Sequence, residues 1–131
     1  MLSYELNSKI LKLAPRFEAK EIAPDSFEKL KGNSSAGLVV WSGASDQTIY
    51  GDPSVNHAFR AWHDSIHLKL NADFSTTGER SVALEQARLI GGDSLGTVLM
   101  AEIVGQLEYF QKHGSFPVDQ VEFIKQYMRG K

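Results

Sequence analysis

The chain has 131 residues, a formal net charge of −2 at pH 7, an apolar fraction of 42% and no cysteine. This length is typical of a single domain, and the lack of cysteine excludes a disulfide framework, a thiolate zinc site and a cysteine nucleophile. The slightly acidic balance argues against a nucleic-acid-binding protein, while the short apolar runs and the polar N-terminus indicate a soluble cytoplasmic protein without membrane span or secretion signal.

The first part of the chain, residues 1–36, is predicted to be largely irregular. Apolar residues within Leu6–Leu13 favour a short helix that Pro15 ends, because proline has no amide hydrogen to donate. Asp25 and Glu28 have the spacing of a capping box, which predicts a second short helix.

Two β-prone runs follow in the region 37–51. Leu38–Trp41 and Thr48–Tyr50 flank a loop rich in Gly, Ser and Asp, a pattern typical of a β-hairpin. Because two strands alone are only marginally stable, we expect this hairpin to pack on helices.

The remaining residues, 54–129, have the period of amphipathic helices. We therefore predict an α+β fold that is mostly α, a bundle of three to four helices with a small N-terminal β-hairpin. The predicted helices extend from Ser54 to Leu70, from Thr76 to Ile90, from Asp93 or Ser94 to Gly114, and onward from Pro117.

A polar stripe borders the apolar face of the first long helix. It contains Asn56, Arg60, His63 and His67, and the last two belong to an HDxxH motif. Residues four apart on a helix project from the same face, with Cβ atoms about 5–6 Å apart, so the two imidazoles are placed to chelate one divalent cation.

Carboxylates on the next two helices are predicted to approach this pair. Glu79 falls on the core-facing side of the second helix, where a carboxylate costs several kcal/mol unless it meets a cation or hydrogen-bond donors. In antiparallel neighbouring helices, Glu79 would lie near His67, and Glu102 on the third helix would approach from the opposite side. Gln86 and Gln106 continue the two polar stripes.

These residues suggest a metal site made of His63, His67 and Glu79. Two imidazoles, one carboxylate and a water are typical of catalytic zinc and, with more open positions, of iron or manganese. A metal-bound water can attack a carbonyl or phosphoryl group, so we expect a metal-dependent hydrolase. Arg60 would anchor an anionic substrate, because guanidinium groups pair well with phosphate or carboxylate.

Further residues have candidate roles around this centre. Asp64 and Glu102 are the candidate catalytic groups, and Asn56, Gln86 and Gln106 are expected to support the ligands through hydrogen bonds. Asp64 stands where zinc proteases of the HExxH type have a glutamate general base, which argues against a protease of that type.

Two other interpretations account for the same pattern. The histidines, the glutamate and the glutamines could form a buried hydrogen-bonded network in a non-enzymatic accessory or interaction protein. Alternatively, Arg60 and the histidine pair could form an anion site. A homo-oligomer formed through an exposed helix face is compatible with each of these interpretations.

Two stretches carry a resemblance to a known group of proteins. The first is Asn56–Asp64 with His67–Leu68, Asp73–Ser75 and Gly78–Arg80, and the second is Ala101–Tyr109 with His113–Gly114 and Phe116–Pro117. Both stretches resemble small uncharacterised proteins of tailed phages and marine viral genomes. The resemblance covers about residues 48–127 and implies a viral or virus-derived origin. It implies no activity.

Overall fold

The computed structural model describes residues 2–33, 37–46, 48–91 and 93–129. Its elements in chain order are α1 (Tyr4–Leu13), β1 (Phe17–Lys20), α2 (Phe27–Asn33), β2 (Leu38–Trp41), α3 (Pro53–Leu70), α4 (Thr76–Ile90), α5 (Asp93–Met100), the π-helical segment η2 (Ala101–Gly105), α6 (Gln106–His113) and α7 (Gln120–Arg129). The predicted class is confirmed, because the chain is mostly helical with a small β part.

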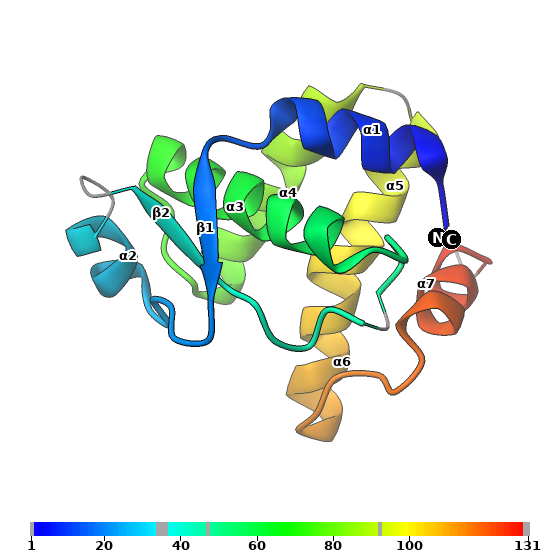
Figure 1. The fold of residues 1–131 in the computed structure, drawn as a ribbon. Coiled ribbons are helices and arrows are strands. Elements are labelled where there is room, and N and C mark those ends of the chain that lie inside the picture. The colour runs from blue at the N-terminus through cyan, green and yellow to red at the C-terminus, as the bar shows by residue number, and fades with distance from the viewer. Residues whose placement is uncertain (1, 34–36, 47, 92, 130–131) are drawn as a thin grey trace.

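The helix α3 is the central element of the fold (Figure 1). It contacts α1, α2, α4 and both strands. Trp62, Ala58 and Ile66 on its buried face join a core that α1, α4 and α5 complete. The element with the candidate histidines is therefore held from several sides, which suits a site that needs fixed geometry.

Local sequence signals set both ends of α3. Asp52 caps the N-terminus by accepting a hydrogen bond from the amide of Ser54 at 2.9 Å, and Pro53 occupies the first turn, where it needs no hydrogen-bond acceptor. At the C-terminus, Asn71 adopts a left-handed conformation with φ 51°, a conformation that asparagine tolerates. The chain then turns back towards α4.

Ser75 caps α4. Its hydroxyl accepts the amide of Gly78 at 3.1 Å. A Cβ atom at Gly78 would overlap the backbone carbonyl group of Asp73, so only glycine fits this close approach between the turn and the helix. Because the Ser75 hydroxyl already accepts a hydrogen bond from an amide of the first helical turn, the carboxylate of Glu79 is not needed as a cap and can contact α3.

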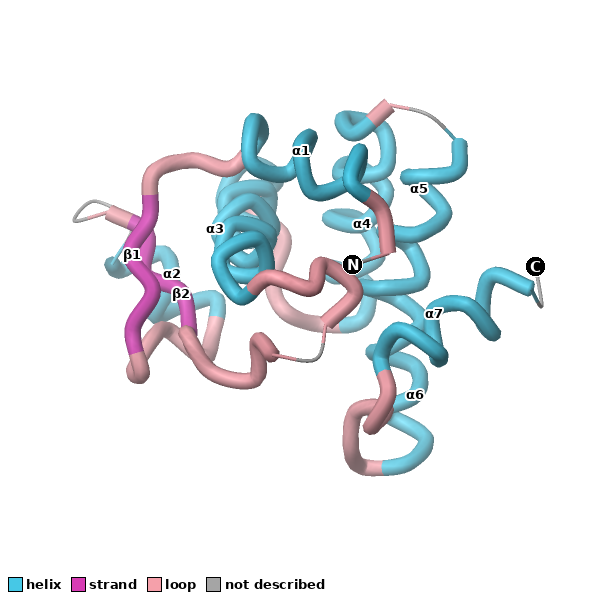
Figure 2. The backbone as a smooth tube through the Cα atoms, turned by 45° about the vertical axis from the view of Figure 1, so that its right-hand side comes forward, coloured by secondary structure: helices cyan, strands magenta, loops and turns pink. Residues whose placement is uncertain are grey.

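The predicted β-hairpin over residues 37–51 is wrong. β2 forms at the expected residues, but it pairs in parallel with β1, so that Phe17 lies opposite Leu38, and α2 makes the connection between them (Figure 2). Thr48–Tyr50 forms no strand. All three residues are buried, which is incompatible with the alternating exposure of a two-stranded hairpin, and the segment instead packs against α1.

The expectation of an irregular segment over residues 1–36 is also wrong for its described part, which contains α1, β1 and α2. The two short helices are confirmed, and α1 contributes the fully buried Leu6 and Ile10 to the core. The hydroxyl of Ser26, rather than the carboxylate of Asp25, caps α2 by accepting the amide of Lys29 at 3.2 Å.

The long helical stretch after α4 departs from regular α-helix in the middle. Residues Ala101–Gly105 are π-helical, between α5 and α6. Single π-helical turns inside α-helices are rare overall, and those that do occur often lie at functional sites. No helix among the described residues combines the length and the apolar composition that a membrane span requires.

Candidate metal centre and adjoining pocket

The side chains of His63, His67 and Glu79 meet between α3 and α4. Glu79 Oε2 lies 2.9 Å from His63 Nε2, and Glu79 Oε1 lies 3.3 Å from His67 Nε2. The two Nε2 atoms lie 3.2 Å apart. The structure thus brings together the three residues that the sequence selects as ligands, and they could hold a metal ion.

A carbonyl oxygen lies at the Nδ1 atom of each imidazole. His63 Nδ1 lies 2.7 Å from the side-chain oxygen of Gln86, and His67 Nδ1 lies 2.7 Å from the backbone oxygen of Ala72. Such oxygens only accept hydrogen bonds, so each Nδ1 atom must donate its proton. In the neutral rings, both Nε2 atoms therefore carry lone pairs, and these face Glu79. Histidine ligands of metals are held by partners of this kind.

The distances match those between the ligands of a small cation. Nitrogen and oxygen ligands at about 2.0–2.2 Å from a tetrahedral zinc ion lie roughly 3.3–3.6 Å from one another. The Nε2 atoms of His63 and His67 lie 3.2 Å apart, and they lie 2.9 Å from Oε2 and 3.3 Å from Oε1 of Glu79, respectively. A small outward movement of these side chains would therefore give the ligand spacing.

Aromatic rings enclose the two histidines. Phe59 stacks on His63 with a centroid distance of 5.7 Å, and Phe74 meets His67 edge-on at 4.7 Å. His67 is fully buried, whereas the side chains of His63 and Glu79 are 16% and 17% exposed. The cluster is accordingly open on the side of His63 and Glu79 and closed behind His67.

The buried surroundings shift the pKa values of the cluster. Burial raises the pKa of Glu79, but hydrogen bonds from His63 and His67 outweigh it and bring the value to about 2. Burial lowers the pKa of His63, and the hydrogen bond and negative charge of Glu79 reverse this, so the net shift is upward. Without a metal, the lone pairs and the carboxylate thus attract a proton.

Asp64 lies beside this cluster without facing the pocket that the described residues form. Burial raises its pKa to about 6, although His63 and His67 act in the opposite direction. The side chain is not among those that line the pocket in the described part of the chain.

Arg60 organises a loop. Its Nη1 donates to the backbone oxygens of Trp41 and Gly43, and its Nη2 donates to that of Ala44. The guanidinium carbon also lies 5.3 Å from the centre of the Trp41 ring. Asn56 supports the same loop by donating to the hydroxyl of Ser45 at 2.9 Å, and so does not contact the candidate ligands directly.

Glu102 lies on η2, away from the cluster of His63, His67 and Glu79. Its carboxylate accepts a hydrogen bond from Gln106 at 2.7 Å, so Gln106 supports Glu102 and not the histidines. Burial raises the pKa of Glu102 to about 7, with Gln106 and Arg60 acting in the opposite direction.

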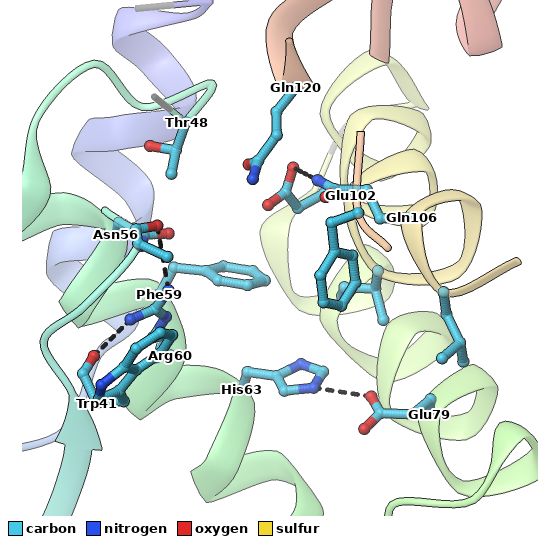
Figure 3. A pocket seen from close by; sticks show the side chains of 14 residues that line it. Trp41, Thr48, Asn56, Phe59, Arg60, His63, Glu79, Glu102, Gln106 and Gln120 are labelled. Carbon is cyan, nitrogen blue, oxygen red and sulfur yellow. Dashed lines mark hydrogen bonds and ion pairs between the residues drawn. The ribbon is translucent and has the colours of Figure 1, made fainter. Parts of the chain in front are cut away.

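A pocket of about 320 Å³ joins these groups (Figure 3). This is within the range of small-molecule sites. His63 and Glu79 form one end, and Glu102, Gln106 and Gln120 lie at the other. The sequence pattern did not predict four further members of the site, because each comes from a part of the chain outside the helical stripes. They are the backbone carbonyl group of Ala72 and the side chains of Trp41, Phe116 and Gln120.

No protein-family model, curated protein or solved structure matches this chain. The chemistry of the site is therefore the basis for a functional proposal.

Proposed function

We propose that His63, His67 and Glu79 bind one divalent cation of the zinc, iron or manganese type, and that the protein is a metal-dependent hydrolase of a small substrate. The observation that carries this proposal is the placement of the two imidazoles between carbonyl oxygens and the Glu79 carboxylate. Both Nδ1 atoms lie 2.7 Å from carbonyl oxygens, so the neutral rings would direct two Nε2 lone pairs, 3.2 Å apart, at the carboxylate of Glu79.

The position of the pocket supports catalysis at this centre. His63 and Glu79 line the pocket, whereas the fully buried His67 lies behind them. A cation held by these three side chains would have its open coordination position on the pocket side. When bound, it would supply a Lewis acid and a water of lowered pKa.

Two further side chains have roles in this proposal. Glu102 lines the pocket and has a pKa of about 7, so it is suited to exchange a proton with substrate or water near neutral pH. Arg60 has five N–H donors, and three hydrogen bonds to loop carbonyl groups leave two for an anionic group of the substrate. Asp64 is a weaker catalytic candidate than Glu102 because it lies outside the pocket lining.

The competing function is that of a non-enzymatic accessory or interaction protein. The low pKa of Glu79 and the raised pKa of His63 favour an ion pair in the absence of metal, and such a pair can serve structure alone. In that case a proton permanently occupies the position that we assign to the cation.

Melting curves in EDTA and in zinc separate the two functions. A cation that binds only the folded state stabilises it by about 2.7 kcal/mol at a hundredfold excess over its dissociation constant, which raises the melting temperature by several degrees. We expect this shift in the wild type and in His113→Ala, which removes an exposed histidine outside the cluster, and no shift in His63→Ala. Coincident wild-type curves in EDTA and in zinc, iron or manganese would reject the metal site.

Hydrolysis is then tested on the metal-loaded protein. With p-nitrophenyl phosphate and p-nitrophenyl acetate as probes, we expect release of nitrophenol that EDTA abolishes and that Glu79→Gln reduces to background. Metal binding without any turnover of these or related esters would retain the metal site and remove the hydrolase assignment.

A further inference from the structure

The end of the pocket opposite His63 and Glu79 has a different chemistry from the candidate metal centre. It combines one carboxyl group with two amide groups, and of these the metal proposal uses only Glu102. The polar groups are Glu102, Gln106 and Gln120, and three aromatic residues, Trp41, Phe59 and Phe116, line the pocket as a whole.

The backbone of η2 places Glu102 at this end. The π-helical turn Ala101–Gly105 interrupts a long helix at the residues that form this wall of the pocket. A π-helical turn has poorer backbone geometry than the α-helix on either side, so its presence beside a pocket indicates a functional constraint. One oxygen of Glu102 accepts a hydrogen bond from Gln106, and the other is directed into the pocket (Figure 3).

Gln120 adds donor and acceptor capacity beside Glu102. It is the first residue of α7, and its amide group is directed towards the Glu102 carboxyl group (Figure 3). Its side chain makes no hydrogen bond to another residue in the described part of the chain. A carboxyl oxygen and an unpaired amide thus face the same space, where they can bind adjacent donor and acceptor atoms of a ligand.

The aromatic walls favour a flat ligand. Tyr50 and His63 stack on Phe59 at 5.4 and 5.7 Å, so the Phe59 ring is fixed in place as a rigid part of the pocket wall. Trp41 and Phe116 remain 49% and 55% exposed, although both line the pocket. Large apolar side chains exposed at the rim of a pocket are typical of binding sites, and aromatic faces stack well on planar rings.

We propose that this end of the pocket binds a planar heteroaromatic ring whose edge carries adjacent hydrogen-bond donor and acceptor atoms, as in a purine, a pyrimidine or nicotinamide. The ring packs against the aromatic side chains that line the pocket, and its polar edge faces Glu102 and Gln120. A purely hydrocarbon ring is disfavoured because it would leave the carboxyl and amide groups buried without partners. This inference deepens the proposed function by naming the substrate class, and it rests on that function only for the reacting group at the His63 end.

Binding is measured on the full chain in EDTA, so that no metal contributes. The probes are adenine, cytosine and nicotinamide, and the control ring is toluene, which has no hydrogen-bonding edge. Trp41 lines the pocket and Trp62 is buried in the core, so fluorescence quenching by a bound ring should disappear in Trp41→Phe while calorimetry still detects binding. We expect at least one probe to bind more tightly than toluene.

Substitutions of Gln120 and Phe116 test the polar and the aromatic contacts of the ring. We expect Gln120→Leu to weaken binding of that probe by about 10-fold or more, since a pocket built to hydrogen-bond its ligand discriminates strongly when a partner is lost. Gln126→Leu, on the exposed side of the same helix, is the matched control and should leave binding unchanged. Phe116→Ala, at the exposed rim, should also weaken binding without affecting the fold.

The outcomes distinguish this inference from the metal proposal. Binding of a ring by a protein that shows no metal-dependent melting shift supports the ring site and rejects the metal site. Failure of all three probes at millimolar concentration, equal binding of toluene, or binding that is insensitive to Gln120→Leu overturns the ring site whether or not metal binds.

Discussion

The Nε2 atoms of His63 and His67 lie 3.2 Å apart on rings whose Nδ1 atoms are both occupied by carbonyl acceptors. Two lone pairs at this separation repel each other unless a cation or a proton lies between them and the carboxylate of Glu79. The relationship therefore links metal binding, protonation and the stability of the α3–α4 contact, and the following predictions test these links.

Metal binding should weaken in acid. The pKa of His63 is raised above its ordinary value of 6.5 by Glu79, although burial acts against this. A cation must displace the proton from His63, so the apparent affinity should fall about tenfold per pH unit below that pKa and level off above it. Calorimetric titration with zinc in two buffers of different ionisation enthalpy measures the release of about one proton. An affinity that is constant between pH 5.5 and 8 would contradict the assignment of His63 as a ligand.

Gln86→Leu should reduce metal affinity without removing a ligand. The substitution deletes the acceptor of the His63 Nδ1 proton, so the ring is free to take the other tautomer or to rotate. Loss of such a partner typically costs 10–100-fold in affinity. Gln111→Leu is the control, because Gln111 is exposed and its amide bonds to Thr76 outside the cluster. Equal zinc affinities for the two variants would show that Gln86 does not orient the histidine.

Gly78→Ala should destabilise the protein by about 1–3 kcal/mol, a typical cost for an added methyl group that the surroundings cannot accept. The new Cβ atom would press on the carbonyl group of Asp73 and displace the turn that holds Ala72 against His67. Urea denaturation measures the loss, and zinc affinity should fall with it. Gly32→Ala is the control, because a Cβ atom there meets nothing within 4 Å and alanine favours the helix. A neutral Gly78→Ala would mean that the turn can move freely.

Glu102 should make the protein less stable as pH rises from about 4.5 to about 7. Its pKa is raised from 4.5 to about 7, so in this interval the folded chain keeps a proton that the unfolded chain has lost. The free energy of unfolding then falls with pH, by at most roughly 3 kcal/mol at about 1.4 kcal/mol per pKa unit, and is constant above that interval. Urea denaturation at pH 5 and pH 8 measures this difference.

The matched variants isolate the contribution of Glu102. Glu102→Gln should remove this part of the pH dependence, whereas Glu108→Gln, at an exposed position of α6, should keep it. The same pH dependence in wild type and Glu102→Gln would show that other groups cause it.

Much of the helical half of the fold follows from the sequence. The apolar period gives α3 and α4 nearly to the residue, because Asp52 and Pro53 at one end of α3 and Ser75 at the start of α4 are local signals that act through the neighbouring backbone. The sheet does not follow in the same way. Phe17–Lys20 has little β propensity and becomes a strand only because Leu38–Trp41 lies beside it.

The sequence determined the ligand set of the candidate centre, since the four-residue spacing of His63 and His67 is fixed by helix geometry and Glu79 lies at the start of the next core-facing helix. Only the tertiary structure decided what surrounds them. The carbonyl oxygen of Ala72 that fixes His67, the loop that Arg60 holds, and the meeting of Glu102 with Gln120 all join residues that no local periodicity relates. The helical period places residues three or four apart on the same face, so the sequence alone shows which residues share a helix face. A pocket is formed by separate elements, and their relative positions depend on the packing of the whole core.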